Sequence, residues 1–211
     1  MMDNTEKPTT PELADSTEQR IFDAAHQVFV QKGLDGAKMQ EIADHAGINK
    51  ALLHYYFRTK EKLFEMVAKA VINRAFPAVQ QLIEADMPLE QKIERFVDFY
   101  IDLISRNPFV PLFIIGEINK HPDQFFEKII PAAPPRPERF FRQVEEAVAE
   151  GRIRPISPRH LLVNVLSMCV FPIVARPMLR IVMGMSSQEL NLFLKERKEE
   201  VKSFIFAALR P

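Results

Sequence analysis

The sequence predicts an all-α protein of about nine helices, with a three-helix N-terminal head followed by a larger helical bundle. Apolar residues recur at helical spacing along almost the whole chain, and the alternating pattern of strands is nearly absent. The breaks between these periodic segments fall at proline or glycine. Apolar residues make up 47% of the 211 residues, which is enough for a real core and argues against wholesale disorder.

The N-terminal segment, residues 1–15, is polar and contains Pro8 and Pro11. We expect a flexible arm there, with a start-site extension as the alternative. Ser16 and Gln19 match the capping-box pattern, so a first helix is predicted from Ser16 until Gly33 ends it.

Two short helices complete the three-helix head, and a longer helix follows it. A short apolar-spaced segment, residues 39–46, is closed by Gly47, and Asn49 is placed to cap a second short helix that runs to about residue 57. Thr59 is placed to cap a longer helix. Pro77 lies inside this longer pattern and is expected to kink it or end it.

Beyond Pro88 the pattern predicts a bundle of amphipathic helices. Residues 89–104 form a clear apolar stripe, and Asn107-Pro108 ends it. Residues 131–137 hold four prolines and are predicted to be a loop or the entry to a helix. Further helices are predicted over residues 109–119, 138–150, 161 onward and 188–209, the last capped by Ser186 or Ser187.

Composition excludes several classes of protein. Lys plus Arg and Asp plus Glu each total 28, so any nucleic-acid surface must be a local basic patch. The only cysteine, Cys169, lies in an apolar run and is predicted to be a buried thiol. The sequence predicts no metal site and no cofactor, because the five histidines are scattered and Glu41 with His45 is a common chance pair.

The most apolar segment, residues 161–183, is predicted to be a buried helix rather than a membrane span. It carries Arg176 and Arg180 as well as two prolines, whereas a spanning helix is apolar with few charges. The N-terminus has no apolar stretch typical of a signal peptide, and a reducing cytoplasm fits the single cysteine.

Residues 39–58 have the layout of a helix-turn-helix, in which two short helices are joined by a tight turn containing glycine. Ala43 is small enough to let the second helix cross closely, and Gly47 relieves the steric cost of the turn. A local basic excess follows, because Lys50, Arg58, Lys60 and Lys62 are opposed by Glu61 alone. The second helix is short enough to enter a DNA major groove.

The same region carries several residue clusters in a fixed order. They are Ile21-Phe-Asp-Ala-Ala25, Phe29, Lys32-Gly33, Ile42-Ala43, Ala46-Gly47, Leu53, Tyr55-Tyr56-Phe57 and Lys60-Glu-Lys-Leu63. In this order and spacing the chain resembles the tetracycline-repressor (TetR) family of bacterial transcription regulators. The resemblance implies a three-helix DNA-binding head, a long connecting fourth helix, and a C-terminal helical domain that binds an effector and dimerises.

The chain departs from the family pattern at three positions. Ala37-Lys38 replace the hydroxyl residue that often starts the first short helix, Asn49 replaces a capping serine, and His54 replaces an aromatic residue. By position, the resemblance places Lys50, Ala51, Leu52 and His54 on the base side, and Lys38, Gln40, Tyr55, Tyr56 and Lys60 on the DNA backbone. Leu53 and Phe57 are expected to pack in the core of the head instead, and core packing is also the alternative for Tyr56.

Two-fold symmetric readers use two half-sites, with about 34 Å between recognition helices, so the protein is predicted to be a homodimer on a palindromic operator. The predicted dimer surface is the last helix pair, residues 158–183 and 187–208. The apolar stripe of the last helix favours it, and the charged segment 195–200 argues against it. A solvated charged face over intrachain core remains the alternative. The stripe comprises Leu190, Leu194, Val201, Phe204, Ile205 and Ala208.

The bundle is rich in large apolar side chains, which suggests a pocket for an apolar or amphipathic small molecule, with ordinary core as the alternative. Glu117 and Arg176 are candidate polar anchors, or else structural ion-pair partners. The predicted pocket residues are Phe96, Phe99, Phe113, Glu117, Met168 and Phe171.

Together these features predict a cytoplasmic DNA-binding regulator, with repression favoured, that leaves its operator when a ligand binds. The predicted parts are an arm over residues 1–15, a DNA-binding domain over 16–62, and an effector-binding and dimerisation domain over 63–211. The sequence shows no nucleotide loop or hydrolase motif, so no catalytic residue is predicted. A helical enzyme or a protein-binding adaptor of unrecognised type remains the alternative.

Overall fold

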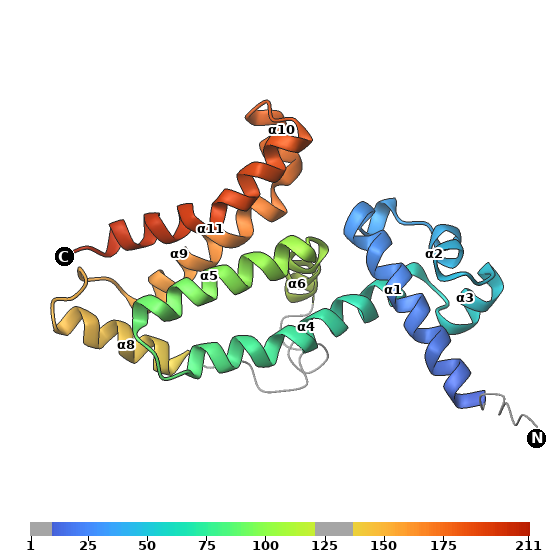
Figure 1. The fold of residues 1–211 in the computed structure, drawn as a ribbon, viewed down its shortest axis with the longest axis horizontal. Helices are drawn as coiled ribbons and strands as arrows, with labels where there is room; N and C mark the ends of the chain where they lie inside the picture. The colour runs from blue at the N-terminus through green and yellow to red at the C-terminus, as the bar shows by residue number, and fades with distance from the viewer. Residues whose placement is uncertain (1–9, 121–136) are drawn as a thin grey trace, which may run out of the picture. The chain divides into compact units, whose positions relative to one another are not determined.

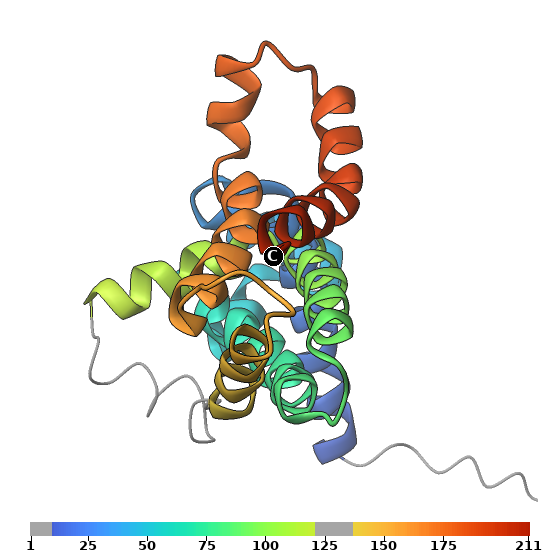
Figure 2. The same ribbon diagram turned by 90° about the vertical axis from the view of Figure 1, so that its left-hand side faces the viewer.

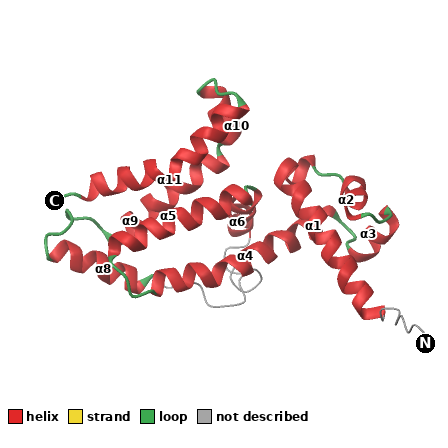
Figure 3. Cartoon of the chain, viewed as in Figure 1, coloured by secondary structure: helices red, strands yellow, loops and turns green. Residues whose placement is uncertain are grey.

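The computed structural model describes residues 10–120 and 137–211 of the chain. Every regular element in those two stretches is a helix, as Figure 3 shows, and the all-α prediction is confirmed. The described residues form ten helices, against about nine predicted. They fall into two compact units, residues 1–70 and 71–211, which are treated separately below.

Helix α1 (Thr10–Gly36) begins earlier than the sequence predicts. The capping box at Ser16 is wrong, because Ser16 lies inside the helix. An amide within a helix has an intrahelical partner and needs no cap, and the Gln19 side chain donates instead to Asp23 Oδ1 at 2.9 Å. Of the predicted arm, residues 10–15 belong to α1 and residues 1–9 lie outside the described part.

Gly33 interrupts α1, although it does not end it. Its backbone takes φ 66° and ψ −172°, outside the helical region, and helical structure resumes up to Gly36. The predicted stop is therefore a break within α1. Helices α2 (Met39–Ala46) and α3 (Lys50–Tyr56) complete the three-helix head, and α4 (Lys60–Glu84) begins within the same compact unit.

The head has a fully buried apolar core. Ile21 and Phe29 of α1, Ile42 of α2, Leu53 of α3 and Leu63 of α4 are each at most 1% exposed. The ring of Phe29 meets that of Phe64 edge-to-face, with 4.9 Å between centroids. The predicted cap at Thr59 is present, because Lys62 N donates to Thr59 Oγ1 at 3.2 Å.

Helix α4 continues through Pro77 to Glu84, so the proline does not end it. Residues up to Ala70 belong to the first compact unit and those from Val71 to the second. One continuous helix therefore carries residues of both units.

The second unit is a helical bundle (Figure 1). Its core includes Val97 of α5, Val144 of α8, Val165 of α9 and Val201 of α11, all at most 2% exposed. Helices α9 and α11 pack against each other, and the short α10 contacts both. In Figure 2 α10 is the orange helix at the top of the bundle. The helices are α5 (Leu89–Arg106), α6 (Phe109–Lys120), α8 (Glu138–Ala149), α9 (Pro158–Val174), α10 (Arg176–Val182) and α11 (Ser187–Leu209).

Local signals set the ends of several of these helices. Ser186 caps α11 in a complete capping box, in which its hydroxyl accepts from Glu189 N and Glu189 Oε2 accepts from Ser186 N. These two bonds lower the pKa of Glu189. Pro137 stands at the start of α8, as predicted, whereas residues 131–136 of the predicted proline-rich loop lie outside the described part.

None of the described helices is alone long and apolar enough to cross a membrane. Helices α9 and α10 together have the length and composition, but they are bent by 75° relative to each other. Leu161, Val165 and Cys169 of α9 lie in the bundle core. The apolar segment 161–183 is thus a core helix followed by a separate short one.

Cys169 is buried, as predicted, with 2% of its surface exposed. Burial raises the pKa of its thiol to about 12, and the nearby Arg197 opposes this only in part. Tyr100 is also affected, since burial and then Cys169 raise its pKa to about 12. The thiol is therefore protonated and shielded at neutral pH.

We predict that Cys169 of the folded protein resists N-ethylmaleimide at pH 8. A pKa of about 12 instead of 9.0 lowers the thiolate fraction about 1000-fold, and burial adds to this protection. The measurement is the labelling rate by mass spectrometry, with guanidinium-unfolded protein as the fully reactive control. Equal labelling rates for folded and unfolded protein would contradict the prediction.

Candidate nucleic-acid interface

The turn between α2 and α3 is closed by backbone hydrogen bonds in the Schellman arrangement. Ile48 N donates to Ala43 O at 3.0 Å, and Gly47 N donates to Asp44 O at 3.1 Å. Gly47 takes the left-handed conformation, with φ 64° and ψ 37°. This conformation costs a residue with a Cβ free energy, so the sequence requirement for glycine is explained.

Arg20 of α1 binds this turn through its guanidinium group. Its Nη2 donates to Ala46 O at 2.5 Å and to Gly47 O at 3.0 Å. A Cβ on Gly47 would stand 2.9 Å from the same Nη2. Sequence reasoning missed Arg20, because 26 residues separate it from the carbonyl and no local pattern marks the pairing.

Helix α3 is capped and seated as predicted. Asn49 Oδ1 accepts from Leu52 N at 2.7 Å, and Leu53 is fully buried. Phe57, expected in the core, is only half-buried, and its ring stacks on that of Tyr56. One buried side chain thus holds a helix whose other face is open.

The open face of α3 carries the predicted base-side residues. Lys50, Ala51, Leu52 and His54 are all exposed, and Tyr55 is 81% exposed. An exposed tyrosine and lysine on a short helix suit contacts with base edges and phosphates.

The residues predicted to contact the DNA backbone differ in exposure and in the hydrogen bonds that they already make within the protein. Lys38 is exposed and makes no side-chain cap on α2, whereas the Gln40 amide donates to Asp44 Oδ1 at 2.8 Å. Tyr56 is half-buried, with its ring edge-to-face with Tyr55. Lys60 Nζ donates to Ala37 O at 3.1 Å and, more weakly, to Asp35 O at 3.4 Å. Lys60 thus ties the start of α4 to the segment before α2.

The Glu41 and His45 pair has other partners than a metal ion. The Glu41 carboxylate accepts from Lys32 Nζ at 2.6 Å, and His45 Nδ1 lies 2.9 Å from the Glu41 backbone carbonyl oxygen. Both contacts stabilise the head, the first by joining α1 to α2. The Nδ1 atom of His54 lies 3.4 Å from the backbone carbonyl oxygen of Arg58, four residues along the chain.

Within the second unit, an apolar cavity of about 30 Å³ lies where α4, α5, α8 and α9 meet. Phe96 of α5 lines it, as the pocket prediction expects. The sequence missed one lining residue of a different kind, Lys92, which is 2% exposed. The complete lining is Leu82, Ile83, Lys92, Ile93, Phe96, Pro137, Phe140, Leu162 and Val165.

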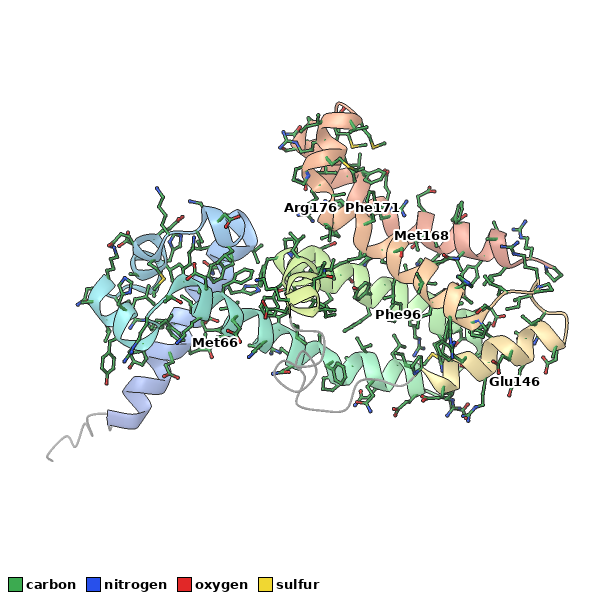
Figure 4. The ribbon with its side chains drawn as sticks, turned by 180° about the vertical axis from the view of Figure 1, so that it is seen from behind. Met66, Phe96, Glu146, Met168, Phe171 and Arg176 are labelled. Carbon is green, nitrogen blue, oxygen red and sulfur yellow. The ribbon has the colours of Figure 1, made fainter. Side chains whose placement is uncertain are left out.

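The other predicted pocket residues do not gather around this cavity. Phe99 is half-buried on α5, Phe113 is buried on α6, and Met168 lines a separate groove with α11. Phe171 is 52% exposed. Figure 4 shows Phe171 near the α9–α10 junction and Phe96 inside the bundle.

The two predicted polar anchors also lie elsewhere. Glu117 forms an ion pair with Lys120 on its own helix at 3.5 Å, as expected of a structural ion-pair partner. Arg176 lines an open groove with Lys195 and Lys198, and burial lowers the pKa of its guanidinium. Neither side chain lines the apolar cavity.

Two family models match the chain. Residues 21–67 match "Bacterial regulatory proteins, tetR family", and residues 89–205 match "Tetracyclin repressor-like, C-terminal domain". The protein belongs to the TetR family. The first match covers α1 from Ile21, all of α2 and α3, and the start of α4.

The sequence of this TetR-family regulator is only distantly similar to those of known relatives. It is 22% identical over 191 residues to the HTH-type transcriptional regulator RutR of Escherichia coli K12, covering 90% of this chain and 89% of RutR. It is 29% identical over 93 residues to the activator FasR of Mycolicibacterium smegmatis, covering 44% of this chain and less than half, 42%, of FasR.

A solved structure shows the same fold. FadR from Bacillus subtilis, solved in complex with stearoyl-CoA, is 14% identical, with a TM-score of 0.58 over 92% of this chain and 100% of that one.

The predicted dimer stripe on α11 divides between two faces of the helix. Leu190, Leu194, Val201 and Ile205 are buried within their own bundle, as the alternative expects. Three apolar side chains of this helix pair are largely exposed: Phe204 of α11 at 66%, Val163 of α9 at 56% and Leu192 of α11 at 57%. Of the predicted stripe, Phe204 therefore belongs to the exposed apolar surface, whereas Leu190, Leu194, Val201 and Ile205 do not.

We predict that Gly47→Ala destabilises the head by about 2–3 kcal/mol, as measured by chemical denaturation. The left-handed backbone accounts for about 1–2 kcal/mol. The displaced Arg20 hydrogen bonds account for about 1 kcal/mol more. DNA binding should weaken because the turn positions α3.

The matched control is Gly184→Ala. Gly184 has almost the same φ, 65°, and open space around a built Cβ. We expect it to cost about 1–2 kcal/mol and to leave DNA binding unchanged. Equal effects of the two substitutions on DNA binding would show that the Arg20 contact does not position α3.

Proposed function

We propose that this TetR-family regulator is a repressor that binds a palindromic operator as a homodimer and is released by an apolar or amphipathic ligand. The single observation that carries the DNA-binding role is the exposed face of α3, with Leu53 alone buried beneath it. In this proposal Lys50, Ala51, Leu52 and His54 contact base edges. The phosphate backbone is contacted by Lys38, Tyr55, Tyr56 and Lys60. Gln40, on α2, also belongs to this backbone-contacting set.

Dimerisation follows from the size of the reading element. A seven-residue helix such as α3 touches few base pairs, and two copies about 34 Å apart read two half-sites. The exposed apolar residues Val163 and Phe204 lie on α9 and α11, within the helix pair expected to form the interface. We propose this face, rather than the buried α11 stripe, as the dimer contact.

The ligand site in this proposal is the apolar cavity lined by Phe96 and Phe140. The neighbour FadR holds stearoyl-CoA, so a protein of this fold accommodates an acyl ligand. Release from DNA requires a ligand that binds the two head spacings with different affinity. By linkage, DNA and ligand then oppose each other to the same extent.

Repression is the simpler outcome of promoter occupancy, because a bound dimer blocks polymerase without additional parts. We propose that the protein acts in the cytoplasm, where its DNA target lies, and that it has no catalytic activity. The relatives carry names of transcriptional regulators, which supports this class.

The proposal is tested by footprinting the full-length protein on the DNA upstream of its own coding sequence. We expect a protected, two-fold symmetric sequence whose affinity falls steeply with salt. Protection without sequence preference at every salt concentration would overturn the operator-binding role.

We predict that Lys50→Ala reduces discrimination between operator and unrelated DNA by about 1–3 kcal/mol, because it removes a base-edge donor. The measurement is fluorescence anisotropy with an operator duplex and a scrambled duplex at one salt concentration. The control is Lys195→Ala, an exposed lysine of α11, which should change neither affinity. An unchanged ratio in Lys50→Ala removes Lys50 from base readout.

We predict that Phe204→Glu weakens the homodimer at least about 30-fold, because it places a charge in an apolar contact. Sedimentation velocity measures the monomer–dimer equilibrium. Ile118→Glu is the matched control, since Ile118 is an apolar residue of α6 that is 38% exposed. If Phe204→Glu stays dimeric at the same concentrations as Ile118→Glu, this face is not the interface.

A further inference from the structure

Lys92 is a charged side chain buried where an apolar one is expected. Only 2% of its surface is exposed, and it lies on α5 among the core residues Leu89, Ile93 and Phe96. Its Nζ donates to Ile83 O at 2.7 Å. An ammonium has three donor hydrogens, so this carbonyl satisfies part of its capacity.

The ammonium lies beside the apolar cavity. Lys92 and Ile83 both line it, and every other lining side chain is apolar. Four helices contribute to the lining, with Leu82 from α4, Phe96 from α5, Phe140 from α8 and Val165 from α9. The cavity therefore combines an apolar wall with one cationic group at its edge.

The charged groups near Lys92 are Asp86 and Arg139, and these two pair with each other. Asp86 is the nearby carboxylate, and Arg139 Nη2 already binds its Oδ1 at 2.5 Å. Burial lowers the pKa of Lys92, Arg139 lowers it further, and Asp86 acts in the opposite direction. Among the described residues no carboxylate lies within ion-pair distance of Lys92 itself, which makes its surroundings favourable for an added anion.

We propose that Lys92 binds the carboxylate of a ligand whose apolar chain enters this cavity. This inference rests on the proposed ligand-binding function and names the chemical class of the ligand, an aliphatic monocarboxylate. A charge-assisted hydrogen bond from a buried ammonium is among the stronger polar contacts in proteins. It also relieves the cost of holding an unpaired charge away from water.

The same contact couples the ligand to the connecting helix. Ile83 lies in the last turn of α4, so the bond from Lys92 holds the end of α4 against α5. A cavity of about 30 Å³ holds no more than about one water, so an acyl chain must move the surrounding helices apart. The ligand carboxylate competes with Ile83 O for Lys92, and the end of α4 is released.

The first experiment measures binding by isothermal titration calorimetry on the full-length protein. The probes are decanoate and its uncharged counterpart 1-decanol, both below micelle-forming concentration. We expect decanoate to bind at least about tenfold more tightly than 1-decanol. Equal affinities, or no binding of decanoate, overturn the proposal without any substitution.

Three variants assign the preference to Lys92. Lys92→Met keeps an unbranched side chain but removes the charge, and we expect the preference for decanoate to be lost. Lys92→Arg keeps the charge and should retain a preference, so it also reports on whether position 92 tolerates change. Lys195→Met is the exposed matched control and should bind as the wild type does. If Lys92→Met prefers decanoate as strongly as Lys195→Met, Lys92 is not the anchor.

The second experiment measures operator affinity with and without decanoate. We expect decanoate to weaken DNA binding of the wild type but to have no effect on Lys92→Met at the same concentration. An undiminished decanoate effect in Lys92→Met overturns the coupling. A wild type that binds decanoate but no operator contradicts the proposed function and leaves the carboxylate site standing, so the two failures are distinct.

Discussion

The hydrogen bonds from Arg20 to the turn at Gly47 are the constraint on which the placement of α3 depends. Helix α3 has a single fully buried side chain, Leu53, so its own packing gives it little orientation. The turn supplies the rest, because Gly47 holds a left-handed backbone and the Arg20 guanidinium binds two carbonyls on either side of it. Because a Cβ on Gly47 would come within 2.9 Å of Arg20 Nη2, a larger residue at position 47 would displace the Arg20 guanidinium from these carbonyls.

Helix α4 links this head to the bundle through contacts at its two ends. At its start, Lys60 binds the carbonyls of Asp35 and Ala37, which lie just before α2. At its end, Lys92 binds the carbonyl of Ile83. Both contacts are single lysine side chains on backbone oxygens, so they are stronger than neutral hydrogen bonds yet open to competition from an anion. In the proposed mechanism a ligand that binds Lys92 therefore acts on α4, whose first residues belong to the DNA-binding head.

The bundle divides its apolar residues between an internal core and an external face. On α11, Val201 and Ile205 pack inward, while Phe204 points to solvent beside them. In the proposed function α9 contributes to both sites, because its Val163 belongs to the dimer contact and its Leu162 and Val165 line the ligand cavity.

Local sequence patterns were enough to predict the helical class, the helix-turn-helix, the caps at Asn49, Thr59 and Ser186, and the burial of Cys169. Each depends on spacing within a few residues or on one apolar run. Contacts between distant parts of the chain, which no local pattern reveals, place Arg20 on the turn and Lys92 beside the cavity. They also make Phe96, and not Phe171, a lining residue of that cavity. Periodicity shows that a helix face is buried but not which helix covers it, because that choice is made by residues far apart in the chain.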